Sequence, residues 1–379
     1  MNIVIATPEF PTDRFPFTGV YVVEQARALY RQGHKVSILC ARQMEGRGLR
    51  FAFEETSYGD EGLPVIKVEY PIIRGASYIP CVIALRRALR KVKRYFEPDL
   101  IHAHVTLPVG FAAVVCGKVL GIPVAVTEHW GPVRQICDSR LGEWGMRFVT
   151  IRADRMIAVS EHLKQEMISE LDTSRPIDVI PNLYDPFKFY RADNGSEPQS
   201  ADILFVGRGG DLRKGNDLVL KSFARAMQRS TIKMRLVMVG SGLEKELAPL
   251  VSELGIAGDC VFTGALPLDR LSSLMRRCAF LVVASRYETF SLVLVEAMAC
   301  GKPVIATRCG GPEGLVTSET GMLVPVDDTE AMADAMVEMS RDLARYDARS
   351  IARHARESYG EDVIARQLTR MYEGVINRS

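Results

Sequence analysis

The sequence predicts an α/β protein made of two doubly wound domains, each with a mostly parallel sheet. Three observations lead to this expectation. Short apolar segments of strand length alternate with helical patterns along the chain. The length of 379 residues is enough for two domains of about 150 residues or more. Residues 191–202 are polar, with Gly195, Ser196 and Pro198, and this linker composition precedes a new apolar strand.

The composition is that of an ordinary soluble protein. Hydrophobic residues make up 47% of the chain and charged residues 25%, and the net charge is +2. This balance gives no basis for a nucleic-acid partner. The eight cysteines contain no Cys-x-x-Cys pair. We therefore interpret them as reduced thiols of a cytoplasmic protein, rather than as a disulfide or zinc frame.

The sequence shows no pattern of export or of a membrane span. The chain opens with Met1-Asn-Ile-Val-Ile-Ala, a strand pattern without the basic region and apolar core of a signal peptide. The longest apolar stretch, residues 109–127, is interrupted by Lys118 and by Gly121-Ile-Pro123. It predicts a buried helix followed by a strand.

Strands and helices alternate through the first half of the chain, as a parallel sheet requires. The strand candidates are Ile3–Thr7, Lys35–Cys40, Val65–Val68, Leu100–His104, Val124–Glu128, Met156–Val159 and Val179–Pro181. After the first strand, a loop ends at Gly19, where an amphipathic helix over residues 20–31 begins. Gly19 would let a phosphate approach the backbone at this helix start, with a plain turn into the helix as the alternative.

Three histidines stand at strand ends in this half. His102 and His104 are two residues apart on one strand face, so a metal pair is conceivable. No carboxylate or cysteine stands nearby in sequence to complete such a site, and we expect no metal. His129 ends the strand that begins at Val124, just before Trp130-Gly131, where ligands of α/β folds bind. This place makes His129 a candidate to contact the ligand, with a structural histidine at a strand end as the alternative.

Residues 82–96 predict one amphipathic, basic helix. Leu85, Leu89, Val92 and Phe96 form its apolar stripe, and six basic residues with no acidic one fill the rest. The plain interpretation is a solvated helix face. The alternative is a patch that rests on anionic lipid at the membrane surface.

The most informative segment is residues 285–304. An apolar strand over residues 280–284 precedes it, and a helix from about Ser291 to Ala299 ends at Gly301 and Pro303. The turn brings Glu288 to the carboxyl end of a sheet, and the helix start points its positive dipole at the same place. Glu296 follows within two turns. This arrangement suits a ligand with hydroxyls and phosphates, although a core helix with two incidental glutamates is the alternative.

A second segment has complementary charges. The strand over residues 203–207 leads into a Gly-containing loop that Arg208 and Lys214 flank, and a helix starts near Asn216. Two cations at such a loop suit a diphosphate. An ordinary turn with surface charges is the alternative.

Several of these motifs together resemble the retaining glycosyltransferases of family 4. They are Arg208 directly after Val-Gly, Lys214 before Gly215, Glu288 and Glu296 followed by Ala-Met-Ala-x-Gly-x-Pro-Val, Gly310-Gly311-Pro-Glu313, and Thr320-Gly321-Met-Leu-Val-Pro325. The resemblance implies the GT-B fold of two facing Rossmann-like domains. Residues 1–186 would be the acceptor domain and 187–360 the nucleotide-sugar donor domain. Residues 361–379 would be a helix that crosses back onto the first domain.

The resemblance also implies roles for single residues. The catalytic set would be Glu288, His129, Arg208 and Lys214. The donor-binding set would be Gly19, Arg208, Lys214, Leu266, Glu288, Phe290, Ser291, Leu292 and Glu296. Family members often have a Gly pair where this chain has Thr18-Gly19.

The expected reaction moves a sugar from a nucleoside-diphosphate sugar to a hydroxyl with retention of anomeric configuration. A UDP-sugar is the favoured donor, with GDP-mannose as the alternative, and the acceptor would be a glycan or a lipid-linked molecule of envelope or exopolysaccharide synthesis. The sequence has no Asp-x-Asp, so we expect neither metal nor cofactor. The alternatives are a nucleotide-sugar epimerase, a phosphorylase or other GT-B enzyme, and a catalytically silent nucleotide-sugar-binding subunit.

Overall fold

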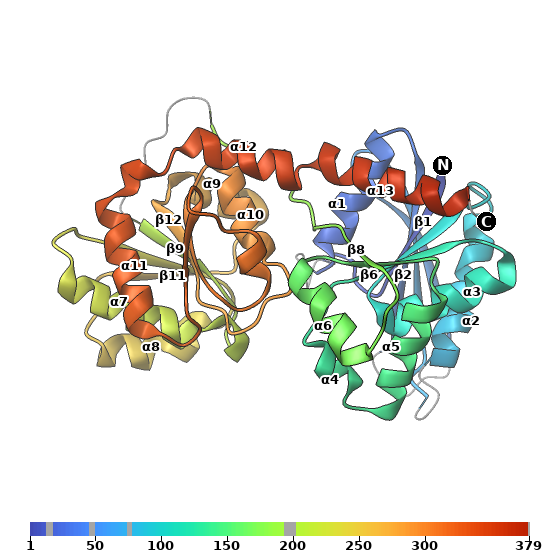
Figure 1. The fold of residues 1–379 in the computed structure, drawn as a ribbon, viewed down its shortest axis with the longest axis horizontal. Helices are drawn as coiled ribbons and strands as arrows, with labels where there is room; N and C mark the ends of the chain where they lie inside the picture. Colours follow the sequence, from blue (N-terminus) through green and yellow to red (C-terminus); the bar gives the residue numbers. More distant parts are fainter. Residues whose placement is uncertain (13–17, 45–49, 74–77, 193–201, 378–379) are drawn as a thin grey trace. The chain divides into compact units, whose positions relative to one another are not determined.

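The computed structural model describes the whole chain except residues 13–17, 45–49, 74–77, 193–201 and 378–379. The chain divides into two compact units, residues 1–183 with 361–379 and residues 184–360. The second unit thus begins at Tyr184, against residue 187 in the expected division. Each unit has its own twisted sheet with helices around it (Figure 1), and the α/β class expected from the sequence is confirmed.

The first unit is built on a sheet with the strand order β3-β4-β2-β1-β5-β6-β7-β8. Its strands are β1 (Asn2–Thr7), β2 (Lys35–Gln43), β3 (Ala52–Tyr58), β4 (Leu63–Tyr70), β5 (Leu100–His104), β6 (Val124–Glu128), β7 (Arg155–Ala158) and β8 (Ile177–Val179). Its helices are α1 (Val20–Arg31), α2 (Tyr78–Val92), α3 (Phe111–Leu120), α4 (Val133–Cys137), α5 (Arg140–Arg152), α6 (Glu161–Leu171) and α13 (Glu361–Ile376), with a short turn η1 (Thr106–Gly110).

Three elements of this unit differ from the expectation. Strand β8 ends at Val179, where the predicted strand begins. Strand β3 was not predicted, because its residues are mostly exposed and show no apolar alternation. It pairs antiparallel with β4 at the edge of an otherwise parallel sheet. The helix expected over residues 82–96 begins earlier, at Tyr78, and ends at Val92. Pro98 follows shortly after this end, and the residue before a proline disfavours helical backbone.

The second unit has a sheet with the order β11-β10-β9-β12-β13-β14, and all of its strand pairs are parallel. The strands are β9 (Asp202–Val206), β10 (Arg235–Val239), β11 (Cys260–Gly264), β12 (Phe280–Val283), β13 (Val304–Thr307) and β14 (Gly321–Val324). The helices are α7 (Asn216–Arg229), α8 (Leu243–Glu253), α9 (Leu268–Arg277), α10 (Leu292–Ala299), α11 (Thr329–Arg341) and α12 (Ala348–Tyr359), with short turns η2 (Leu212–Lys214), η3 (Gly311–Gly314) and η4 (Leu343–Arg345).

Helix α13 follows the second unit in sequence but packs within the first, beside α1 (Figure 1). Ile364, Leu368 and Tyr372 are fully buried in the core that α1, β1 and β2 also line. The Tyr372 hydroxyl lies 2.6 Å from His102 Nδ1 on β5. Burial lowers the pKa of His102 to about 3 and keeps the ring neutral, so Nδ1 can accept a hydrogen bond from the tyrosine hydroxyl.

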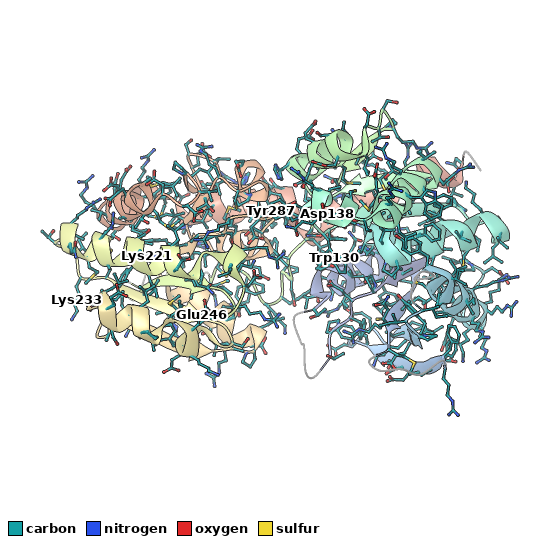
Figure 2. All side chains as sticks on the ribbon, turned by 90° about the horizontal axis from the view of Figure 1, so that it is seen from below. Trp130, Asp138, Lys221, Lys233, Glu246 and Tyr287 are labelled. Carbon is teal, nitrogen blue, oxygen red and sulfur yellow. The ribbon has the colours of Figure 1, made fainter. Side chains whose placement is uncertain are left out.

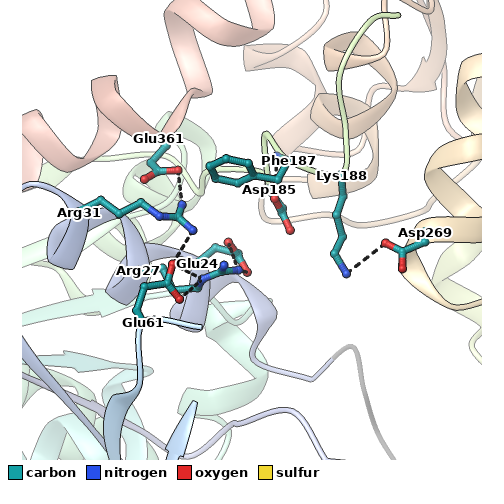
Figure 3. Close-up of polar contacts among 9 residues, drawn as sticks. All are labelled: Glu24, Arg27, Arg31, Glu61, Asp185, Phe187, Lys188, Asp269 and Glu361. Atoms are coloured by element: carbon teal, nitrogen blue, oxygen red, sulfur yellow. Dashed lines mark hydrogen bonds and ion pairs between the residues drawn. The ribbon is translucent and has the colours of Figure 1, made fainter. Parts of the chain in front are cut away.

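An ion-pair cluster also fastens α13 to α1 (Figure 3). The Arg31 guanidinium contacts Glu361 at 2.7 Å and Glu61 at 2.6 Å. Arg27 pairs with Glu24 and Glu61 at 3.1 Å. Because these side chains are partly buried and share partners, the cluster orients the start of α13 more firmly than an isolated surface pair would.

Within the part of the chain that the structure describes, none of the helices has the length and apolarity needed to cross a bilayer.

The buried Tyr372–His102 contact gives a stability prediction. Tyr372→Phe removes the hydroxyl and leaves His102 Nδ1 unsatisfied in the core, which should cost about 1–3 kcal/mol. Tyr95→Phe is the matched control, because Tyr95 is 46% exposed and should change stability by less than about 0.5 kcal/mol. Denaturant unfolding followed by circular dichroism measures both. Equal midpoints for the two variants would contradict the assignment.

Candidate active site

The second unit has a topological switch point between β9 and β12. From β9 the chain continues to β10 and β11 on one side, and then returns to β12 and β13 on the other side of β9. The loops that follow β9 and β12 therefore leave the same edge of the sheet in opposite directions. Open α/β sheets bind ligands in the crevice at such a point.

The two loops touch directly. Gly215, at the start of α7, has a positive φ of 63°, and a Cβ at this position would collide with the carbonyl oxygen of Ala284 after β12. The Arg286 amide donates to the Arg213 carbonyl at 2.6 Å. Glycine is thus required at position 215 both by its backbone angle and by this close approach.

Lys214 and Glu288 meet across this contact. Lys214 Nζ lies 2.7 Å from Glu288 Oε1, and the Ser285 hydroxyl donates to the same oxygen at 2.8 Å. The Glu288 backbone is held as well, because its amide donates to the Cys309 carbonyl and its carbonyl accepts from the Gly311 amide at 2.7 Å. Tyr287, just before Glu288, marks this loop in Figure 2. Glu288 is therefore held by groups from three loops, two at its carboxylate and one at its backbone.

Arg208 is exposed in the same loop as Lys214, just after the end of β9. Among the described residues we find no ion-pair partner for its guanidinium. Its backbone is anchored, since Asn216 Nδ2 donates to the Arg208 carbonyl at 2.9 Å. Glu246 (Figure 2) accepts from the Gly210 amide at 2.5 Å. The loop is thus held while the cation stays available to an anion.

The start of α10 presents free donors at the same edge. Ser291 precedes the helix with a positive φ of 80°, which is uncommon for a residue with a side chain. Its hydroxyl is buried and has no hydrogen-bond partner among the described residues. Phe290 is buried, with its ring 5.9 Å from that of Tyr359. Leu292, the first helical residue, contributes one of the amides that lack a partner within the helix.

Glu296 lies one turn further along α10 and is only 9% exposed. Burial, with a smaller contribution from the nearby carboxylate of Asp185, raises the pKa of Glu296 from 4.5 to about 8. No hydrogen bond to its carboxyl group is found within the described residues. A buried carboxyl group without a protein partner is costly unless a ligand satisfies it, so Glu296 is a candidate to bind hydroxyl donors.

Leu266 follows β11, two strands away from β9 in the sheet. It shares the carboxyl edge with the other residues of this unit, but no contact joins it to Lys214 or Glu288 among the interactions of the described chain. Its place agrees with a site long enough for a nucleotide, and its expected contact with the base stays a prediction.

Gly19 and His129 belong to the first unit. Gly19 has φ 71°, and a Cβ there would lie 2.6 Å from the Glu9 carbonyl oxygen. The Tyr21 ring stacks on His129 with centroids 4.3 Å apart, and the Tyr21 hydroxyl donates to Glu9 Oε2 at 2.6 Å. Tyr21 therefore joins the loop after β1 to the end of β6. The approach of Gly19 and His129 to a donor bound in the second unit stays a prediction.

The His129 ring is held by partners inside the first unit. Its Nε2 lies 2.8 Å from His104 Nδ1, and the nearby Asn182 side chain acts against the lowering of its pKa. Burial lowers the pKa of His129 to about 3, so the ring is neutral at pH 7. A direct role of His129 toward the sugar would therefore need its backbone, its ring edge or a rearrangement of these bonds.

His102 and His104 bond to neighbours in the protein. His102 contacts Tyr372 and also Thr127, whose hydroxyl is 2.7 Å from Nε2, and His104 contacts His129. In the described residues there is no group of three or more His, Cys, Asp or Glu that could hold a metal ion.

Glu128 was not singled out from the sequence. It is fully buried at the end of β6, where Oε1 accepts from the His129 and Trp130 amides at 2.8 and 2.7 Å, and Oε2 accepts from the Thr106 amide at 3.0 Å. Burial raises the pKa of Glu128, against the effect of these N–H donors. The carboxyl group shapes the loops after β5 and β6. The sequence signal that could have identified Glu128 is its place as a glutamate at the end of an otherwise apolar strand.

Two family models match the chain. The model described as "Glycosyltransferase Family 4" matches residues 18–187, and the one described as "Glycosyl transferases group 1" matches residues 200–342. Together they cover both units.

Curated relatives agree with this result. An N-acetyl-alpha-D-glucosaminyl L-malate synthase of Bacillus anthracis is 25% identical over 94% of this chain and 93% of its own length. A D-inositol 3-phosphate glycosyltransferase of Rhodococcus opacus is 30% identical over 69% of this chain and 63% of its own length.

Solved structures share the fold. Sucrose-phosphate synthase from Thermosynechococcus elongatus superimposes with a TM-score of 0.75 at 22% identity, over 100% of both chains. Anabaena HepE in complex with UDP gives a TM-score of 0.76 at 17% identity, over 99% of this chain and 100% of its own. The fold is thus GT-B, as expected from the sequence, and the chain belongs to the family 4 glycosyltransferases.

Proposed function

We propose that the enzyme transfers a sugar from a nucleoside-diphosphate sugar to an acceptor hydroxyl with retention of configuration and without a metal ion. The observation that carries this proposal is the cationic edge of the second unit. There Lys214 is paired with Glu288 at 2.7 Å, next to the exposed Arg208 and the start of α10. These groups suit a diphosphate that gains charge as it leaves.

Lys214 is able to serve two partners. An ammonium group has three donors, and only the bond to Glu288 is seen among the described residues. With its side chain 35% exposed, Lys214 can bind a phosphate oxygen and keep Glu288 in place at the same time. Glu288, 13% exposed, would then hold sugar hydroxyls and face the positive charge that develops at the anomeric carbon.

The bond changes follow from this placement. The bond between the anomeric carbon and the β-phosphate oxygen breaks, and the acceptor oxygen forms its bond to that carbon on the same face of the sugar. The acceptor proton passes to the leaving phosphate. Arg208, Lys214, the Ser291 hydroxyl and the first amides of α10 stabilise the diphosphate, so no covalent nucleophile is required.

The donor is proposed to be a UDP-sugar, with GDP-mannose as the alternative. Anabaena HepE, which shares the fold, was solved in complex with UDP, and this supports a uridine nucleotide. Glu296 would accept from the ribose hydroxyls, and Leu266 would contact the base. Gly19 and His129 would contribute to the donor site from the first unit.

The acceptor is proposed to be a glycan or a lipid-linked molecule of envelope or exopolysaccharide synthesis, reached by a cytoplasmic enzyme that contacts the membrane surface. The names of the relatives indicate other acceptors within the family, an L-malate and an inositol 3-phosphate. Small anionic acceptors are therefore the second candidate class.

One assay separates the possible activities. The protein is incubated with radiolabelled UDP-glucose, UDP-N-acetylglucosamine or GDP-mannose, and with glycan, lipid-linked, malate or inositol phosphate acceptors. Transfer with an axial linkage in the product supports the proposal. Isomerisation of the donor without transfer would indicate an epimerase, and tight donor binding with no turnover would indicate a silent subunit.

The roles of Lys214 and Glu296 are separable by kinetics. Lys214 faces a charge that grows in the transition state, whereas Glu296 faces ribose hydroxyls that do not change. Lys214→Ala should lower kcat by about 10²–10³, or about 2.7–4 kcal/mol. Glu296→Gln should mainly raise the donor KM. Steady-state kinetics at saturating acceptor measures both.

Arg213→Ala is the matched control for the lysine variant. Arg213 is the neighbouring cation of the same loop, but it is 61% exposed and paired with Asp211, so kcat should change by less than about threefold. Melting curves check that all three variants stay folded. The assigned roles would be wrong if Lys214→Ala changed only KM while Glu296→Gln abolished kcat.

Glu296 also predicts a pH dependence. Its pKa of about 8 means that the free enzyme holds this proton at pH 7. Hydroxyl donors favour the carboxylate, so binding of a UDP-sugar should release a proton at pH 7 and tighten up to about pH 8, by at most about tenfold per pH unit. Calorimetry in buffers of different ionisation enthalpy counts the proton. Glu296→Gln should abolish its release.

The same group affects folding with a defined sign. In the unfolded chain its pKa is near 4.5, so between pH 4.5 and 8 the folded state binds more protons. The contribution of Glu296 to stability therefore falls as pH rises through this window. Relative to Glu296→Gln, the wild-type protein should lose melting temperature from about pH 5 to about pH 8. A constant difference would contradict the raised pKa.

Metal independence is tested with a chelator. Because protein cations and the α10 dipole face the diphosphate, the transfer rate should be the same with and without EDTA. A rate that falls to background in EDTA and returns with Mg²⁺ or Mn²⁺ would show that these groups do not suffice.

A further inference from the structure

The outer side of α2 carries a stripe with two chemical halves. Ile79, Ile83, Arg86 and Arg90 are all exposed and stand at positions i, i+4, i+7 and i+11 of the helix. At about 3.6 residues per turn, this spacing places them in one line along the helix axis. The first half of the line is apolar and the second half is cationic.

The other basic residues of this region are engaged as well. Lys93 pairs with Glu97 at 2.7 Å, and the remaining three contact β3 or the residue before it. Lys91 Nζ lies 2.5 Å from Glu55 Oε1, and Arg94 lies 3.5 Å from the same oxygen. The Arg87 guanidinium stacks 4.7 Å from the centre of the Phe51 ring. In the described part of the chain, neither Arg86 nor Arg90 has an ion-pair partner. The basic patch expected over residues 82–96 thus narrows to these two arginines.

The apolar end of the stripe continues onto α5. The Tyr78 hydroxyl donates to the Leu141 carbonyl at 3.0 Å, and the Tyr78 and Trp144 rings stack with centroids 6.4 Å apart. Leu141 and Trp144 are 40% and 51% exposed. Tyr78 thus links the start of α2 to α5, and we group the exposed side chains of these two helices as the interfacial face. Its members are Ile79, Ile83, Arg86, Arg90, Leu141 and Trp144.

We propose that the interfacial face docks the first unit onto an anionic lipid bilayer. Isoleucine, leucine and tryptophan side chains would enter the boundary between headgroups and acyl chains, and the two arginines would contact lipid phosphates. Interfacial amphipathic helices bind membranes in the same way, with an apolar face in the bilayer boundary and basic side chains at anionic headgroups. Exposed tryptophan beside apolar residues is also typical of a membrane interface.

Charge complementarity favours a bilayer over a second copy of the chain. A two-fold interface places the same patch on both subunits. The interfacial face contains no carboxylate, so in such a dimer the arginines would meet no opposite charge from this face. An anionic bilayer supplies that charge at every position.

The docking proposal extends the proposed function, because a lipid-linked acceptor would be met at this surface, but it is measured without any transfer. Full-length protein is sedimented with vesicles of phosphatidylcholine alone, or of phosphatidylcholine and phosphatidylglycerol in equal amounts. Binding should require the anionic lipid and weaken with salt. UDP binding by calorimetry is followed in parallel, so a failure of the nucleotide site is recognised separately.

Two double variants of equal charge test the assignment. Arg86→Gln/Arg90→Gln should weaken binding to anionic vesicles about 10- to 30-fold. Lys91→Gln/Arg94→Gln removes the same charge from side chains that face Glu55 and should change binding by less than about threefold. Ile79→Gln/Ile83→Gln should weaken binding without any change of charge. All of these residues lie at the surface, and melting curves confirm that the variants fold.

Trp144 supplies a direct readout of insertion. The chain has two tryptophans, so in a Trp130→Phe background all tryptophan emission comes from Trp144. Its emission should shift to shorter wavelength with anionic vesicles and stay unchanged in Ile79→Gln/Ile83→Gln. The proposal would be overturned if the wild-type protein did not bind anionic vesicles. It would also be overturned if Arg86→Gln/Arg90→Gln and Lys91→Gln/Arg94→Gln lost equal affinity, or if Trp144 emission did not shift. A dimer that Ile79→Gln/Ile83→Gln dissociates, with no vesicle binding, would show that a second copy covers the face.

Discussion

The candidate site of the second unit depends on one close approach of backbone, between the loop that precedes α7 and the loop that follows β12. Gly215 sits against the Ala284 carbonyl where no side chain fits, and the Arg286 amide closes the contact on Arg213. This contact brings Lys214 and Glu288 within 2.7 Å although they are 74 residues apart in sequence. The switch in strand order provides the place, and the glycine allows the loops to reach it.

Charge at this edge suits the proposed ligand, which is both anionic and rich in hydroxyls. Lys214 is partly neutralised by Glu288, while Arg208 is left exposed and held only through its backbone. A fully paired set of cations would have little attraction for a diphosphate, and a fully unpaired set would repel itself. Glu296 adds the complementary property, because its burial and the nearby Asp185 keep it protonated at pH 7. Before a ligand binds, Glu296 therefore adds no negative charge to the edge that is proposed to receive the phosphates.

Much of the fold and of the donor edge was predictable, because both leave short-range signals. Helix α1 and helix α13 have the expected bounds, since apolar periodicity and a glycine or acidic start define them locally. The loop around Arg208 also leaves a local signal, because Gly210 and Gly215 have positive φ angles. Strand β3 was missed because its side chains are exposed on an edge that only pairing with β4 defines. The engagement of Lys91 with Glu55 was missed for the same reason, since the partner is on that strand.

The histidine network of the first unit shows what sequence spacing cannot distinguish. His102 and His104 share a strand face, as a metal pair would, but His102 bonds to Tyr372 in α13 and His104 bonds to His129. Asn182, in the segment that leaves the first unit, lies near His129 and acts on its pKa. Tyr372 lies in the helix with which the chain returns. The returning segment is therefore anchored directly on β5, and the leaving segment passes beside the same histidine network. Because these rings are buried and neutral, their first contribution is to hold the connections in place, and any catalytic contribution of His129 is constrained by the same bonds.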